Sequence, residues 1–227
     1  MSEGFGTPDG YTNTGNADFV VALAMRWSRP GNRVMSKMRG LPRFSLSALL
    51  LFAYTATARA AELDGVAMPD LQDVAGAHLV LNGLALRTYS IIRIHVYVAG
   101  LYLEQRSSNA SEILRSMQPK LLRFAFLRNI DADTARHSWR AAFERTCVEP
   151  CHLSADNISR FLAAVPSVRQ GDISILLFTA QGMDFLMNGH LVGRVTDPEF
   201  ANIILATFIG QHPTSEELKA ALLGAPR

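Results

Sequence analysis

Residues 90–103 read SIIRIHVYVAGLYL and contain the clearest strand pattern in the sequence. The even positions within 92–98 are all β-branched, while the odd positions carry Arg93, His95 and Tyr97. Because successive side chains of a β-strand point to opposite faces, this alternation predicts a strand with one face on an apolar core. We expect the other face, which carries His95 and Tyr97, to meet solvent or a cleft.

Working outward from this strand, five further apolar runs bounded by turn residues predict strands. These runs are residues 78–81, 120–128, 173–178, 184–187 and 190–195. Asn82-Gly83 and Asn188-Gly189 both stand between apolar flanks, so each predicts a tight turn between two strands. The last three runs therefore predict a three-strand meander.

Helical periodicity and capping residues predict five helices. These helices are residues 108–117, 131–147, 154–164, 198–209 and a last one that is capped by Thr214 or Ser215 and ends at Leu223-Gly224. The second has an apolar stripe of Ala135, Trp139, Ala142 and Phe143 and is capped by Asp131 or Asp133. Early strands, central helices, a meander and terminal helices together indicate an α+β fold, in which an antiparallel sheet has helices packed on one face.

Residues 35–60 have the order of a secretory signal peptide. A cationic start precedes a mostly apolar run from 44 to 57, and Ala58-Arg59-Ala60 supplies a small-residue cleavage site. The run is short for a span of about 20 residues, so we expect cleavage and no permanent membrane span. Residues 1–34 are interpreted as a disordered extension or a mis-assigned start. Residues 61–227 are then a single domain, located in the periplasm or secreted.

Charge and motif content exclude several classes of function. Residues 61–227 hold fifteen Lys and Arg against seventeen Asp and Glu, so they offer no broad basic surface for nucleic acid. The six histidines have no ligand spacing and no glycine-rich phosphate loop is present, so we expect no metal and no cofactor. The sequence leaves the oligomeric state open.

The chain has two cysteines, Cys147 and Cys151. In an oxidising compartment they predict a local disulfide at the end of the second helix, where Pro150 prevents continuation. The alternative is a redox-active pair. The structural role is favoured because three residues separate the cysteines and no thioredoxin-like pattern surrounds them.

Arg87 follows the apolar segment Gly83-Leu84-Ala85-Leu86. An arginine keeps its charge under essentially all conditions, so an inward-pointing Arg87 would have to face an anion. An outward-pointing Arg87 at a loop edge would be an ordinary surface residue. Periodicity leaves both readings open.

Several short motifs occur in a recognisable order. They are LNGLALR at 81–87, VYVAGLYL at 96–103, QGD at 170–172, NG at 188–189 and LLG at 222–224. In this order the chain resembles the chalcone isomerase-like domain over nearly all of residues 62–224, most closely its bacterial exported branch. The resemblance implies an open-faced sandwich, with a ligand cleft between the sheet and a layer of helices.

The resemblance also implies a ligand class. Fatty-acid-binding members of this family hold a carboxylate with an arginine and a tyrosine on the neighbouring strand, and Arg87 with Tyr97 resembles that pair. Guanidinium and phenol donors hold a carboxylate through charge-assisted hydrogen bonds. The sequence therefore predicts a protein that binds a small amphipathic carboxylate such as a fatty acid.

Enzymes of the same family are intramolecular lyases that need hydrogen-bond donors at a developing enolate oxygen. The resemblance implies that Tyr97 stands where these enzymes have a threonine on a strand. Their tyrosine and asparagine on the following helix correspond to positions near Asp131 and Ser138. His190 stands where they have a later threonine or serine. With only the arginine retained, an isomerase acting on a flavonoid-like enone is the second hypothesis. A non-catalytic structural or partner-binding domain is the third. The predicted ligand-binding residues are Arg87, Tyr97, His95, Ser138 and His190.

Overall fold

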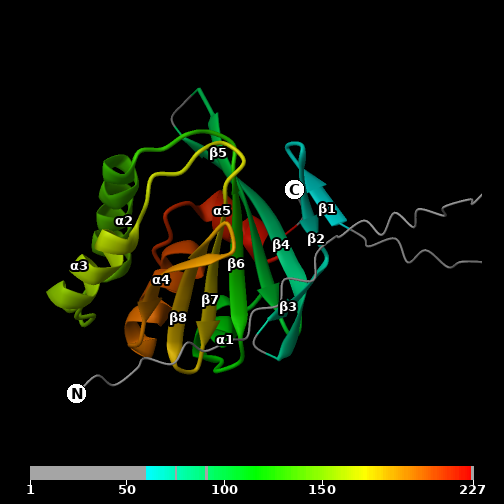
Figure 1. The fold of residues 1–227 in the computed structure, drawn as a ribbon. Coiled ribbons are helices and arrows are strands. Elements are labelled where there is room, and N and C mark those ends of the chain that lie inside the picture. Colours follow the sequence, from blue (N-terminus) through cyan, green and yellow to red (C-terminus); the bar gives the residue numbers. More distant parts are fainter. Residues whose placement is uncertain (1–59, 75, 90–91, 226–227) are drawn as a thin grey trace, which may run out of the picture. The chain divides into compact units, whose positions relative to one another are not determined.

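The computed structural model describes residues 60–74, 76–89 and 92–225. The predicted extension and all of the predicted signal peptide except Ala60 lie outside the described residues. Within the described ranges, seven antiparallel strands form one sheet in the order β3-β4-β5-β6-β7-β8-β9, and β1 and β2 form a separate hairpin (Figure 1). The strands are β1 (Ala60–Leu63), β2 (Val66–Pro69), β3 (Leu71–Val74), β4 (Ala77–Tyr89), β5 (Ile94–Leu103), β6 (Lys120–Phe126), β7 (Ile173–Thr179), β8 (Gly182–Met187) and β9 (His190–Val195).

Each described helix begins directly after a residue whose side chain accepts hydrogen bonds from first-turn N–H groups, as N-caps do. The capping residues are Asn109, Asp131, Ser154, Asp197 and Ser215. The helices are α1 (Ala110–Arg115), α2 (Ala132–Thr146), α3 (Ala155–Ala164), α4 (Pro198–Ile209) and α5 (Glu216–Leu222). All five predicted helices are confirmed.

The helices contribute to one large apolar core on a single face of the seven-stranded sheet. Phe143 of α2, Phe161 of α3 and Phe200 of α4 are buried there with Leu101 and Phe124 of the sheet. Edge-to-face and tilted ring contacts link the three helical phenylalanines to one another. The predicted α+β architecture, with helices packed on one face of an antiparallel sheet, is confirmed.

The opposite face of the sheet carries a second, smaller core. Val98 and Tyr102 of β5 are fully buried there, and the β1–β2 hairpin packs against the same cluster through Met68, Leu63 and Val66. The prediction that β5 has a wet second face is therefore wrong along its C-terminal half. Both faces are apolar there, because Ala99 and Leu101 face the helices while Val98 and Tyr102 face the hairpin side.

The predicted turn at Asn82-Gly83 is also wrong. The two residues lie inside the continuous strand β4, where the pairing with β5 steps from Leu81 opposite Tyr102 to Gly83 opposite Leu101. Asn82 is the extra residue of this β-bulge. Its side-chain amide donates to the Leu222 carbonyl at 2.8 Å, so the Asn-Gly pair joins β4 to the end of α5.

A second bulge separates the two halves of the β4–β5 pairing. Arg87 lies opposite Tyr97, and the next residue, Thr88, lies opposite His95, which leaves Val96 as the extra residue. A bulge inverts the side-chain alternation beyond it. The predicted unbroken β-branched face of residues 92–98 is therefore interrupted, and β5 begins at Ile94 instead of Ser90.

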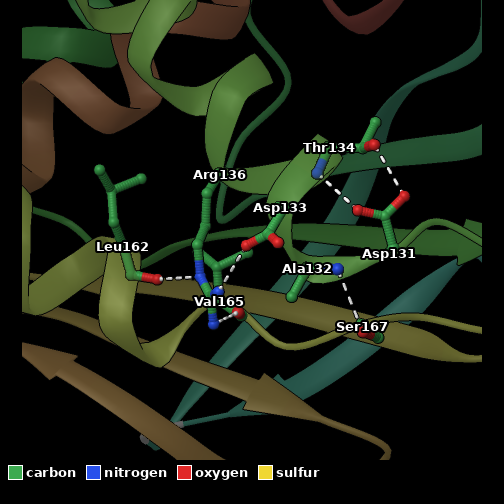
Figure 2. Close-up of polar contacts among 8 residues, drawn as sticks. All are labelled: Asp131, Ala132, Asp133, Thr134, Arg136, Leu162, Val165 and Ser167. Atoms are coloured by element: carbon green, nitrogen blue, oxygen red, sulfur yellow. Dashed lines mark hydrogen bonds and ion pairs between the residues drawn. The ribbon is translucent and has the colours of Figure 1, made fainter.

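A polar network fixes α2 against the end of α3 (Figure 2). The Arg136 guanidinium donates to the carbonyls of Leu162 and Val165 at 3.0 and 3.2 Å and to Asp133 at 3.1 Å. The last carbonyls of a helix have no partner within the helix, so Arg136 caps α3 from the neighbouring element. The Ala132 N–H also donates to the Ser167 hydroxyl at 3.1 Å.

Cys147 and Cys151 form a disulfide, and Cys147 is the C-cap residue of α2. The disulfide therefore lies at the predicted helix end.

Of the helices in the described ranges, none combines the length and the hydropathy needed to cross a lipid bilayer.

Candidate functional site

Arg87 and Tyr97 lie directly opposite each other on β4 and β5. Cross-strand partners project from the same face of a sheet. Tyr97 packs against the large core beneath the helices, and Ala85, two residues before Arg87 on the same face, is part of that core. The two side chains therefore share the helix-facing side of the sheet, and Arg87 is half-buried.

The Tyr97 ring lies among aromatic side chains. Its centroid is 5.2 Å from that of Phe124 and 5.9 Å from that of Phe126, both in edge-on contacts. Burial raises the pKa of Tyr97 to about 12, although the nearby Arg87 charge acts in the opposite direction. The phenol is therefore a neutral hydrogen-bond donor at any physiological pH. None of the described residues forms a hydrogen bond with its hydroxyl.

The Arg87 guanidinium contacts the segment that leads into α5. Its Nη1 donates to the Thr214 carbonyl at 3.4 Å, a long hydrogen bond and the one that Arg87 makes within the described ranges. Glu217 of α5 is close enough to respond to this charge. A hydrogen bond from Ser215 is the main cause that lowers the pKa of Glu217, and Arg87 and Arg93 add to the effect.

This geometry shows that Arg87 points inward, which periodicity alone could not decide. The side chain faces the helix layer, yet its guanidinium has no ion pair within 4.0 Å among the described residues. A guanidinium carries five N–H donors and is most stable opposite an anion. The Arg87–Tyr97 pair therefore offers unused donors of both kinds at the edge of an aromatic core.

His95 does not join this pair. The bulge at Val96 places His95 on the face opposite to Tyr97, so the prediction that the two share a strand face is wrong. Its Nδ1 lies 2.8 Å from a carboxylate oxygen of Asp64, in the turn between β1 and β2. His95 therefore contacts the hairpin side of the sheet.

Ser138 and His190 are also not brought to Arg87. Ser138 is exposed on α2, where its hydroxyl donates to the Thr134 carbonyl at 2.9 Å. His190 is exposed at the start of β9, four strands away from β5 in the sheet order. Asp131 is the exposed N-cap of α2. The structure thus brings together two of the five predicted ligand-binding residues.

Two features of the helix-facing side were not singled out from the sequence. The Arg87 charge helps to lower the pKa of Glu217 only because α5 folds back onto β4, which local periodicity does not show. Lys120 is the first residue of β6 and is 6% exposed. The sequence did contain a signal that Lys120 faces the core, because Lys120 lies on the same strand face as Leu122, Phe124 and Phe126.

In the described part of the chain, no three His, Cys, Asp or Glu residues gather as metal ligands do.

Comparisons with known proteins agree with this architecture. A family profile described as chalcone isomerase-like matches residues 60–224. The crystal structure of a fatty-acid binding protein from Arabidopsis thaliana is similar, with a TM-score of 0.62 and 15% sequence identity, covering 73% of this chain and 96% of the plant chain. At this identity the likeness concerns the fold. A comparison with curated proteins gave no match. Because the family profile spans most of the sequence, the chain belongs to the chalcone isomerase-like family.

Proposed function

We propose that this is an exported chalcone isomerase-like protein that binds an amphipathic carboxylate, such as a fatty acid, between its sheet and its helices. The observation that carries this proposal is the cross-strand pair of Arg87 and Tyr97 on the helix-facing side of the sheet. The similar plant protein is described as a fatty-acid binding protein, which supports the same ligand class.

The chemistry of the pair suits a carboxylate head group. Arg87 supplies a permanent positive charge, and Tyr97 supplies a donor that stays protonated because its pKa is about 12. A hydrogen bond to a charged group contributes about 1.5–3 kcal/mol. Phe126, which is half-buried, is an aromatic neighbour of the pair, and each buried methylene of an acyl tail adds about 0.8 kcal/mol.

Palmitate binding by the delipidated full-length chain, measured by isothermal titration calorimetry and native mass spectrometry, tests the proposal. We expect Arg87→Met to weaken palmitate binding by about 10- to 100-fold, because it removes the charge-assisted hydrogen bonds. Tyr97→Phe should weaken binding less, since it removes one neutral donor and keeps the ring.

The matched control is Arg106→Met, which removes an exposed cation that makes no interaction with the described residues. It should bind palmitate as the wild type does. Methyl palmitate, which has no charge, should bind the wild type and Arg87→Met equally. If palmitate does not bind, or if Arg87→Met binds it as tightly as Arg106→Met, the proposed function is wrong.

Export is tested separately, by the mass and N-terminal sequence of the protein recovered outside the cytoplasm of a bacterial host. Cleavage of the signal peptide formed by residues 35–60 should give a mature chain that begins at Ala61. A recovered chain that begins before Met35 would contradict the assignment of the signal peptide.

A further inference from the structure

A hollow of about 200 Å³ lies where α1, α4 and the ends of β6 and β7 meet. Lys120 lines it together with the apolar side chains Leu114, Met117, Phe178 and Leu205. The hollow is distinct from the Arg87–Tyr97 pair. Tyr97 pairs with Phe126 at the other end of β6, six residues and about 20 Å along the strand from Lys120.

Lys120 is unusual among the charged residues that the structure describes. Its side chain is on the core face of the sheet and the residue is 6% exposed. The Nζ atom lies 2.5 Å from the Ser116 carbonyl oxygen and 3.2 Å from that of Gln118. No carboxylate of the described residues forms an ion pair with it. Glu199, which is exposed, is the acidic residue in the lining of the hollow.

These surroundings disfavour the charged form of Lys120 relative to an exposed lysine. Burial lowers the pKa of Lys120, because a charged ammonium loses hydration that two neutral carbonyls replace only in part. A neutral amine has two N–H groups and one lone pair. The Lys120 Nζ donates to the carbonyls of Ser116 and Gln118, and in the neutral form these two hydrogen bonds leave the nitrogen lone pair for attack on a carbonyl carbon. A desolvated lysine of this kind is a nucleophile for carbonyl compounds.

We propose that this hollow is a binding site for small apolar aldehydes, in which Lys120 forms a reversible imine. The Lys120 nitrogen attacks the carbonyl carbon, a C=N bond forms, and the carbonyl oxygen leaves as water after taking up the two amine protons. The reverse reaction with water releases the aldehyde. No oxidant, reductant or metal is needed.

The size and lining of the hollow indicate the probe. An apolar cavity of about 150 Å³ accepts benzene. The present hollow is somewhat larger, and its walls combine apolar side chains with polar ones such as Thr179 and Asn202. Benzaldehyde combines a ring of that size with the reactive carbonyl, so it is the probe that we would use.

The experiment treats the full-length chain with benzaldehyde and sodium cyanoborohydride at neutral pH and maps the benzylated lysines by peptide mass spectrometry. The sequence contains three lysines, Lys37, Lys120 and Lys219, so the assignment is direct. Lys219 on α5 is the internal control, because its amine lies 3.9 Å from the Glu216 carboxylate and is not in the hollow. We expect Lys120 to react at least about tenfold faster than Lys219.

Two further measurements separate a bound aldehyde from random labelling. Benzyl alcohol, which has the ring but no carbonyl, should slow labelling of Lys120 and leave Lys219 unchanged. Lys120→Arg should lose the fast reaction. Arg87→Met should keep it, even though we expect that variant to bind palmitate more weakly. If Lys120 reacts no faster than Lys219, or if benzyl alcohol does not protect it, the proposed site is wrong while the proposed carboxylate site is unaffected.

Discussion

Replacing Phe161 by alanine is expected to lower the free energy of unfolding by about 4 kcal/mol. Phe161 is 4% exposed and lies at the centre of the aromatic cluster that joins the helices to the sheet. Its ring centroid is 4.9 Å from that of Trp139, 5.7 Å from Phe143, 6.1 Å from Phe200 and 6.2 Å from Phe185. Truncation would leave a cavity bordered by α2, α4 and β8. These three elements cannot all move inward to fill it.

Urea denaturation followed by tryptophan fluorescence measures this loss, because Trp139 reports on the same cluster. The matched control is Leu191→Ala on β9, where the side chain is 52% exposed and little stability should be lost. A Phe161→Ala midpoint that matches the Leu191→Ala midpoint would show that the cluster does not hold the helices on the sheet.

The second large effect is expected at Gly83, inside the first bulge of β4. A Cβ atom at this position would lie 2.2 Å from the Ala221 carbonyl oxygen and 2.3 Å from that of Leu222. Both atoms are backbone, so neither can rotate away. Gly83→Ala should therefore destabilise the protein by about 3 kcal/mol and push the end of α5 off the sheet.

The same variant tests how α5 supports the candidate site, since Thr214, just before α5, accepts the hydrogen bond from Arg87. Hydrogen exchange should show lost protection in α5, together with a lower urea midpoint. Gly189→Ala is the comparison. Gly189 has a φ of +82° and open space around its Cβ position, so only backbone strain of about 1 kcal/mol is expected. Equal losses for the two variants would contradict the close packing of α5 on β4.

The candidate site could be predicted in part. Arg87 and Tyr97 were identified by resemblance, and their meeting depends on a strand pairing that the sequence does not state. His95 was predicted beside Tyr97 because an ideal strand places alternate residues on one face. The extra residue Val96 reverses that alternation. A bulge arises from pairing with a second strand, so no pattern within β5 alone reveals it.

Elements with local causes can be predicted from the sequence alone. The N-caps Asp131, Ser154 and Ser215 and the opening Pro198 start helices where the structure has them, because a cap satisfies N–H groups within one turn of itself. The turn at Asn188-Gly189 has the same kind of cause. Both residues adopt positive φ angles there, which asparagine and glycine tolerate.

Which side chains meet and which are buried depends on the packing of distant segments. Asn82-Gly83 has the same composition as the second Asn-Gly pair, yet α5 and β5 pack around it and make it a bulge within one strand. Lys120 becomes a buried amine only because α1 and α4 cover the end of β6. Burial and cross-strand register depend on contacts between segments distant in sequence, and those contacts override local preference.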